Sequence, residues 1–237
     1  MPFSPPAMSN ANALWQDASS TKLRSLPEQI AERIYGAIVA GEYQPGDRIR
    51  EEALSEAYQV SRGPIREALR LLERDSVVTV LPNRGAHVTP LSPRELNEIF
   101  EIRKLLLGAM VRRFENMPDE FFVQFRRRVD EMIALAKDPQ AAADYSAASV
   151  AIALNLAQAS GNEKLVAILK SLARQSWRYT QLALREPHRR AKSARNWERL
   201  YEALRAGRAG EAGDAMEQLV DDARVEALRL LETAPAP

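Results

Sequence analysis

The chain has no cysteine and only two histidines among its 237 residues. The absence of cysteine excludes disulfides, thiolate metal sites and cysteine nucleophiles, and it is typical of proteins in a reducing compartment. Two histidines leave few side chains for metal binding or acid–base chemistry. No apolar run approaches the roughly 20 residues that span a bilayer, and the N-terminus lacks the pattern of a secretory signal. We therefore expect a cytoplasmic protein with no membrane partner and no cofactor.

The sequence motifs of common enzyme classes are also missing. We find no nucleophile elbow, no phosphate-binding loop and no histidine pair at metal-ligand spacing. Gly207, Gly210 and Gly213 recur at intervals of three, but they do not form the dinucleotide-binding fingerprint. The sequence therefore predicts that the protein is not an enzyme.

Neither sign of charge is in excess, because 33 Lys and Arg residues stand against 32 Asp and Glu, a net charge of +1. A protein that coats nucleic acid nonspecifically would be far more basic. Residues 25–90 are slightly acidic in sum, with eight Arg against ten Asp or Glu. Within residues 61–74, however, four Arg stand against two Glu. Positive charge is therefore concentrated in one short segment.

This segment has the pattern of an amphipathic helix. Ser61 is placed to accept a capping hydrogen bond, and Pro64 falls in the first turn, where its missing N–H costs little. The arginines follow at intervals of four on one side of the helix, as Arg62, Arg66 and Arg70. Apolar residues form a stripe on another side. A row of arginines is more often simply a solvated surface, so the spacing alone is weak evidence for DNA binding.

The flanking sequence strengthens the DNA-binding interpretation. Helical periodicity is present over 27–40 and 51–58, and a brief turn joins the second of these helices to Ser61, which predicts a helix-turn-helix. Two β-branched runs then flank a turn with Arg84 and Gly85 at its tip, which predicts a β-hairpin. We expect a winged helix-turn-helix domain over residues 25–90, preceded by a flexible tail over residues 1–24.

This region resembles the GntR family of bacterial transcription regulators. The family pattern V-S-R-x-P-[VI]-R-E-A-L, followed by R-G-x-x-V, stands here as Val60–Leu69 and Arg84–Val88. Gly63 departs from the pattern, since the family usually has a hydroxyl residue there. The resemblance implies a homodimer that binds a double-stranded, palindromic DNA operator, most commonly as a repressor. It implies DNA contacts by Ser61, Arg62, Arg66, Arg70, Arg84 and Gly85.

The second half of the chain has only helical patterns. Ser92 and Glu95 form a capping-box pattern that opens the first helix. Further helices are predicted over residues 118–137, 139–160, 163–186, 189–206 and 211–232. We expect an antiparallel all-helical bundle over residues 91–232, large enough to enclose a small-molecule pocket, and a short tail over residues 233–237. The fold class is therefore mainly α.

The bundle resembles the ligand-binding domain of the fatty-acid-regulator branch of the GntR family, the FCD domain. The best landmark is the sequence Ala159-Ser160-Gly161-Asn162. Many members of that branch bind a divalent metal through one Asp and three His. The matching positions here hold Ser149, Ala153, Trp197 and Leu219, and none of these side chains can replace those ligands. The resemblance therefore implies a pocket without a metal.

An effector in such a pocket must be oriented by other groups. Arg103 lies near an otherwise apolar helix face, and Arg103 or Arg178 could hold a carboxylate through paired hydrogen bonds. Trp197, Asn155 and Tyr179 are further candidate lining residues. We expect a small organic acid or a larger acyl compound as effector. The alternatives are that Trp197 only fills space, that Arg178 pairs with a helix carboxylate, and that the bundle is a scaffold or adaptor without ligand control.

Overall fold

The computed structural model of the chain describes residues 24–82 and 84–233. The tails expected over residues 1–24 and 233–237 lie almost wholly outside the described residues. The chain divides into two compact units between Leu91 and Ser92. Each unit is described by itself.

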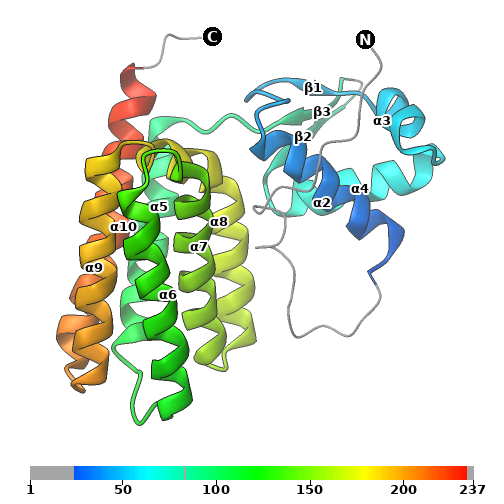
Figure 1. The fold of residues 1–237 in the computed structure, drawn as a ribbon. Coiled ribbons are helices and arrows are strands. Elements are labelled where there is room, and N and C mark those ends of the chain that lie inside the picture. The colour runs from blue at the N-terminus through cyan, green and yellow to red at the C-terminus, as the bar shows by residue number, and fades with distance from the viewer. Residues whose placement is uncertain (1–23, 83, 234–237) are drawn as a thin grey trace. The chain divides into compact units, whose positions relative to one another are not determined.

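The first unit is a winged helix-turn-helix (Figure 1). Its elements follow in the order α2 (Leu26–Val39), β1 (Arg48–Ile49), α3 (Glu51–Tyr58), α4 (Arg62–Arg74), β2 (Val78–Leu81) and β3 (Gly85–Val88). The strands form an antiparallel sheet in the order β1-β3-β2. The predicted fold and hairpin are confirmed. A third, short strand, β1, pairs with β3 of the hairpin and was not predicted from the sequence.

Helix α2 begins with a capping box. The Ser25 hydroxyl accepts a hydrogen bond from the Glu28 N–H at 3.4 Å, while the Glu28 carboxylate accepts one from the Ser25 N–H at 2.8 Å. The buried face of α2 includes Ile34, and α2 packs against the buried face of α4, which includes Ile65 and Leu72. This core turns the charged side of α4 outward.

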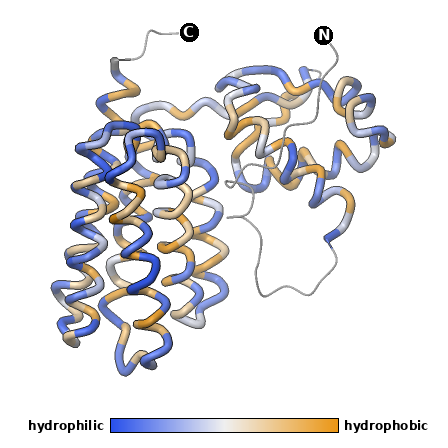
Figure 2. The backbone as a smooth tube through the Cα atoms, in the orientation of Figure 1, coloured by the Kyte–Doolittle hydropathy of each residue, from blue (hydrophilic) through white to orange (hydrophobic). Residues whose placement is uncertain are grey.

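The second unit is an antiparallel bundle of helices that lie side by side (Figure 1). Its helices are α5 (Pro93–Val111), α6 (Asp119–Lys137), α7 (Ala142–Ala159), α8 (Glu163–Ala183), α9 (Pro187–Arg205) and α10 (Ala209–Thr233). Polar and apolar segments alternate along them, as expected for helices with one buried face (Figure 2). The C-terminal helix α10 packs against α5, α8 and α9. The predicted all-helical bundle is confirmed.

Two helix ends differ by three residues from the sequence-based prediction, and the other ends of the bundle helices that were predicted differ by two residues or fewer. Helix α7 begins at Ala142 rather than at residue 139, because Asp138 organises a turn in which its carboxylate accepts a hydrogen bond from the Gln140 N–H at 2.8 Å. Helix α8 ends at Ala183 rather than at residue 186. Pro187 begins the next helix, and the residue before a proline is disfavoured in helical conformation.

Two glycines in α10 differ in what surrounds them, which gives a stability prediction. A Cβ on Gly213 would lie 2.6 Å from Cζ of Arg112, whereas a Cβ on Gly210 would meet nothing within 4 Å. Arg112 pairs with Asp214 and Glu217 and so ties α5 to α10. We expect Gly213→Ala to lower the free energy of unfolding by about 1–2 kcal/mol, because the added methyl group displaces Arg112.

Gly210→Ala is the matched control. It should raise the free energy of unfolding by up to about 1 kcal/mol, because alanine is the better helix former. Urea unfolding of both variants measures the difference. Equal effects of the two substitutions would contradict the close packing of α5 on α10 at Gly213.

Candidate functional site

The turn between α3 and α4 sets the direction of the second helix. Gln59 ends α3 in the left-handed conformation, with φ of 55°, and Ser61 is the N-cap of α4 in extended conformation. The predicted capping hydrogen bond of Ser61 is wrong, because its side chain makes none. Pro64 occupies the third helical position and has no N–H to donate there. The exposed Ser61 hydroxyl is not used by the helix cap.

The three arginines of the α4 row are exposed, and two of them pair with the first turn of α3. Arg62 Nη2 lies 2.6 Å from Glu52 Oε1, and Arg66 Nε lies 2.8 Å from Glu51 Oε2. Arg70 has only a long pair with a glutamate of its own helix, at 4.0 Å. The helix therefore presents three guanidinium groups along one exposed side, two of them already held by carboxylates.

The wing adds two further arginines. Gly85 begins β3 with φ of 82°, a conformation that favours glycine, and the neighbouring Arg84 is exposed. The Arg48 side chain of β1 lies beside Gly85, since a Cβ there would be 3.6 Å from Arg48 Nε. Arg48 was not predicted as part of the site. Its signal in the sequence was the short basic run Arg48-Ile49-Arg50 between two helices.

A second candidate site is a cavity of about 40 Å³ inside the helical bundle. Helices α5, α7, α8, α9 and α10 all contribute to its lining, and Leu107, Val150 and Met216 supply apolar surface. Polar lining comes from Arg103, Ser149, Thr180, Arg189, Ser193, Trp197 and Asp222. One water needs about 10–15 Å³ on this measure, so the cavity has room for a group on the order of three waters in size.

Arg103 is the unusual charge in this lining. It is 8% exposed, and its Nη1 donates to Ser176 Oγ at 2.8 Å while its guanidinium lies 5.0 Å from the centre of the Phe100 ring. No carboxylate among the described residues pairs with it. Burial lowers the pKa of Arg103 to about 10, so it remains protonated at neutral pH. A buried cation without an anionic partner is costly, and an anion in the cavity would offset that cost.

Two uncharged side chains of the lining also carry a polar atom without a partner. Trp197 Nε1 and Thr180 Oγ1 are buried and make no hydrogen bond to any described residue. Both residues line the cavity, and they are 2% and 4% exposed. Buried polar atoms are nearly always hydrogen bonded to protein or to ordered water. The cavity therefore offers unused hydrogen-bonding capacity beside the Arg103 charge.

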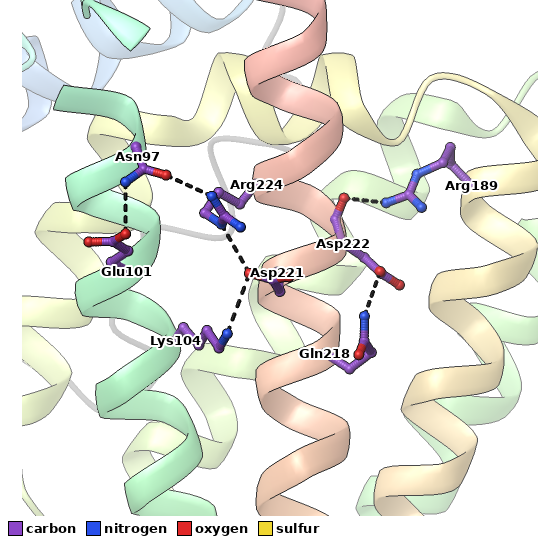
Figure 3. Close-up of polar contacts among 8 residues, drawn as sticks. All are labelled: Asn97, Glu101, Lys104, Arg189, Gln218, Asp221, Asp222 and Arg224. Atoms are coloured by element: carbon purple, nitrogen blue, oxygen red, sulfur yellow. Dashed lines mark hydrogen bonds and ion pairs between the residues drawn. The ribbon is translucent and has the colours of Figure 1, made fainter. Parts of the chain in front are cut away.

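The α10 wall of the cavity is tied by hydrogen bonds to α5 and to α9 (Figure 3). Asp221 accepts hydrogen bonds from Lys104 of α5 at 3.4 Å and from Arg224 at 3.0 Å. The next residue, Asp222, lines the cavity, and its backbone carbonyl accepts a hydrogen bond from Arg189 of α9. A molecule that binds in the cavity and moves α5 or α9 would therefore also move α10.

Both units match known protein families. Residues 26–88 match the family model described as bacterial regulatory proteins, gntR family, and residues 98–222 match that of the FCD domain. The chain belongs to the GntR family of bacterial regulatory proteins. Its members are regulators rather than enzymes, so the prediction that the chain is not an enzyme is confirmed. The two matches together assign a DNA-binding regulator with an effector-binding domain.

Relatives are similar mainly over the winged domain. The HTH-type transcriptional regulator YdhC of Bacillus subtilis is 42% identical over 66 residues, which cover 28% of this chain and 30% of that protein. The gluconate operon transcriptional repressor of the same organism is 28% identical over 134 residues, 56% of this chain and 53% of that protein. The chain thus spans only about a third to a half of the length of these relatives.

Solved structures are similar over most of the chain. A GntR transcriptional regulator from Rhodococcus sp. RHA1 has a TM-score of 0.70 and 25% identity, covering 87% of this chain and 99% of that one. McbR/YncC of Escherichia coli has a TM-score of 0.70 at 19% identity, covering 89% and 98%. The second likeness concerns the fold alone.

The FCD cavity does not fit the metal that many domains of this branch bind. The four positions that match the metal ligands, Ser149, Ala153, Trp197 and Leu219, all line the cavity. None of them carries an imidazole or a carboxylate. Within the described residues, no group of three or more His, Cys, Asp or Glu side chains could hold a metal ion. Trp197 instead places an indole where a histidine would be expected.

Not all of the predicted effector residues line this cavity. Arg103 and Trp197 do, whereas Asn155, Arg178 and Tyr179 are absent from its lining. On α8 the lining residue is Thr180, and its two preceding neighbours point about 100° and 200° away around the helix. Asn155 is similarly displaced from the lining residue two positions before it. Thr180, Arg189, Ser193 and Asp222 line the cavity and were not predicted from the sequence.

None of the helices in the part of the chain that the structure describes is both long and apolar enough to cross a membrane.

Proposed function

We propose that this protein is a transcriptional repressor that binds a palindromic operator as a homodimer in the cytoplasm. The observation that carries the proposal is the exposed arginine row on the second helix of a helix-turn-helix. Recognition helices of this motif place their N-terminal residues in the major groove. Relatives named as repressors, among them that of the gluconate operon, support repression over activation.

The proposed DNA contacts follow from position along α4 and the wing. Arg62 and Arg66 lie in the first turns of α4, where side chains reach base edges, and arginine pairs with guanine through two hydrogen bonds. Arg70 lies one turn further and is assigned to a phosphate. Ser61 has an unused hydroxyl for a phosphate at the helix start. Arg84 and the Gly85 backbone, at the wing tip, would contact phosphates or the minor groove.

Selection of bound sequences from a random DNA pool, with the purified full chain, tests this proposal. We expect a short palindrome to be enriched, and we expect Arg62→Ala and Arg66→Ala to lose that enrichment. The logarithm of the affinity should fall linearly with the logarithm of salt concentration, by about 0.9 for each phosphate neutralised. Arg195→Ala, an exposed arginine of α9, is the control. Failure of the wild-type chain to enrich any sequence would contradict the proposal.

We also propose that a small carboxylate in the FCD cavity modulates the operator affinity. The buried Arg103 charge and the unpartnered Trp197 and Thr180 atoms support an anionic, hydrogen-bonding ligand. A volume of about 40 Å³ favours a small organic acid. A larger acyl compound would require the surrounding helices to move apart. A ligand that binds one arrangement of the bundle better than another shifts the population of DNA-binding states.

Titration calorimetry with a panel of small mono- and dicarboxylates tests this second proposal, with the corresponding amides as controls. We expect a carboxylate to bind and its amide not to bind. Equal binding of acid and amide would contradict a role for the buried charge.

A further inference from the structure

Two adjacent glutamates in the first turn of α3 hold the recognition arginines in different ways. Glu51 accepts a hydrogen bond from Arg66 at Nε, at 2.8 Å. Glu52 accepts one from Arg62 at Nη2, at 2.6 Å. The Glu51 side chain is 33% exposed, whereas the Glu52 side chain is 72% exposed. One carboxylate is thus partly buried, and the other is largely in solvent.

The atom that each arginine uses decides what it has left to offer DNA. Guanine O6 and N7 are read by two parallel N–H donors of one guanidinium. Arg66 gives Glu51 only its Nε, and its two terminal amino groups make no hydrogen bond to any described residue. Arg66 can therefore keep its hydrogen bond to Glu51 and contact a base at the same time. Arginine side chains are otherwise mobile, so the retained bond would fix the direction of the guanidinium.

Arg62 is placed differently. Its Nη2 belongs to both two-donor edges of the guanidinium, so Glu52 lies against the part of Arg62 that would grip a base or a phosphate. The Glu52 carboxylate would also be repelled by the DNA backbone. An exposed ion pair of this kind is weak enough to be displaced by DNA.

We propose that Glu51 is a specificity-determining positioning residue that aims Arg66 at a base, and that Glu52 is a displaceable competitor that shields Arg62 in the unbound protein. This inference rests on the proposed function of α4 as the DNA-reading helix. Substitutions of these neighbouring glutamates should therefore act in opposite ways. Loss of Glu51 lowers the preference for the selected DNA sequence over other sequences. Loss of Glu52 strengthens binding to every DNA sequence.

Fluorescence anisotropy with the full chain tests the inference on two duplexes, one selected from the random pool and one of the same composition in scrambled order. We expect Glu51→Ala to lower the ratio of selected to scrambled affinity about three- to tenfold, because part of one base contact is lost. We expect Glu52→Ala to raise both affinities about two- to fivefold and to leave the ratio unchanged.

Glu51→Gln separates positioning from charge. Its amide oxygen can still accept a hydrogen bond from Arg66 Nε, so we expect a ratio close to that of the wild type. Thermal melting by circular dichroism shows whether each variant is folded. An unchanged ratio in folded Glu51→Ala, or weaker binding to both duplexes in Glu52→Ala, overturns the inference.

The Arg66→Ala variant distinguishes the two possible failures. If it loses sequence preference while Glu51→Ala keeps it, the helix reads DNA and only the role of Glu51 is wrong. If wild type and Arg66→Ala both bind without preference, the proposed function fails and the inference falls with it.

Discussion

Replacement of Arg190 with methionine is expected to lower the free energy of unfolding of the helical bundle by about 3 kcal/mol. Arg190 is fully buried near the start of α9. Its Nη1 donates to the carbonyls of Leu184 and Arg185 at 3.3 and 2.6 Å, and its Nη2 donates to those of Asp138 and Pro139 at 3.0 and 3.2 Å. One guanidinium thus joins the α8–α9 turn to the α6–α7 turn.

The size of the effect follows from what methionine leaves behind. It has a similar length but no donor, so four carbonyls lose a hydrogen bond to a charged group, each worth about 1.5–3 kcal/mol. Part of this loss is offset because a buried charge no longer has to be desolvated. Arg190→Lys should fall between wild type and methionine, since one ammonium group cannot reproduce the planar fork that spans two turns.

Urea unfolding followed by tryptophan fluorescence measures this prediction, because Trp177 and Trp197 are both buried in the bundle. Arg195→Met, on an exposed position of the same helix, is the matched control and should change the stability by no more than about 0.5 kcal/mol. A loss for Arg190→Met as small as that of the control would show that the two turns hold together without the guanidinium.

Replacement of Arg103 with methionine should differ from that of Arg190. It should have little effect on the free energy of unfolding and a large effect on ligand binding. Ser176 Oγ, which accepts the hydrogen bond from Arg103, also donates to the Leu172 carbonyl at 2.8 Å. It therefore stays partnered when Arg103 is removed. Since the Arg103 charge has no anionic partner in the described residues, its removal also relieves a desolvation cost.

Carboxylate affinity should fall in this variant by about thirtyfold or more, because loss of one partner of a buried charge pair costs about 2 kcal/mol at least. Calorimetry gives the affinity, and thermal melting without ligand gives the stability. Arg178→Met, a neighbouring arginine that does not line the cavity, is the control and should retain wild-type affinity. A folded Arg103→Met protein that still binds the carboxylate as wild type does would remove Arg103 from the ligand site.

The elements with strong local signals were predictable from the sequence. The capping box of Ser92 and Glu95 forms as expected, with the Ser92 hydroxyl accepting from the Glu95 N–H at 3.2 Å. The arginine row of α4 and the apolar stripe beside it fix which side of that helix is buried. These features depend on residues within a few positions of one another, so periodicity and capping chemistry reveal them.

Features that depend on distant segments were not predictable. Strand β1 has only two residues, too few to show the alternating pattern of a strand in the sequence. It forms because its backbone pairs with that of β3. The bonds of Glu51 and Glu52 to the arginines need the crossing of α3 on α4, which brings together residues 10 and 15 positions apart.

The winged helix, the helical bundle, the family and the absence of metal-ligating side chains at the family positions could all be predicted from the sequence, because each depends on a local pattern or on the identity of single residues. The set of polar groups that share the cavity could not be predicted in this way. Arg103, Thr180 and Trp197 come from three helices, and which side of each helix faces inward depends on how α5, α8 and α9 pack around α10. Packing of this kind is a property of the whole bundle, since no helix can bury its apolar face alone.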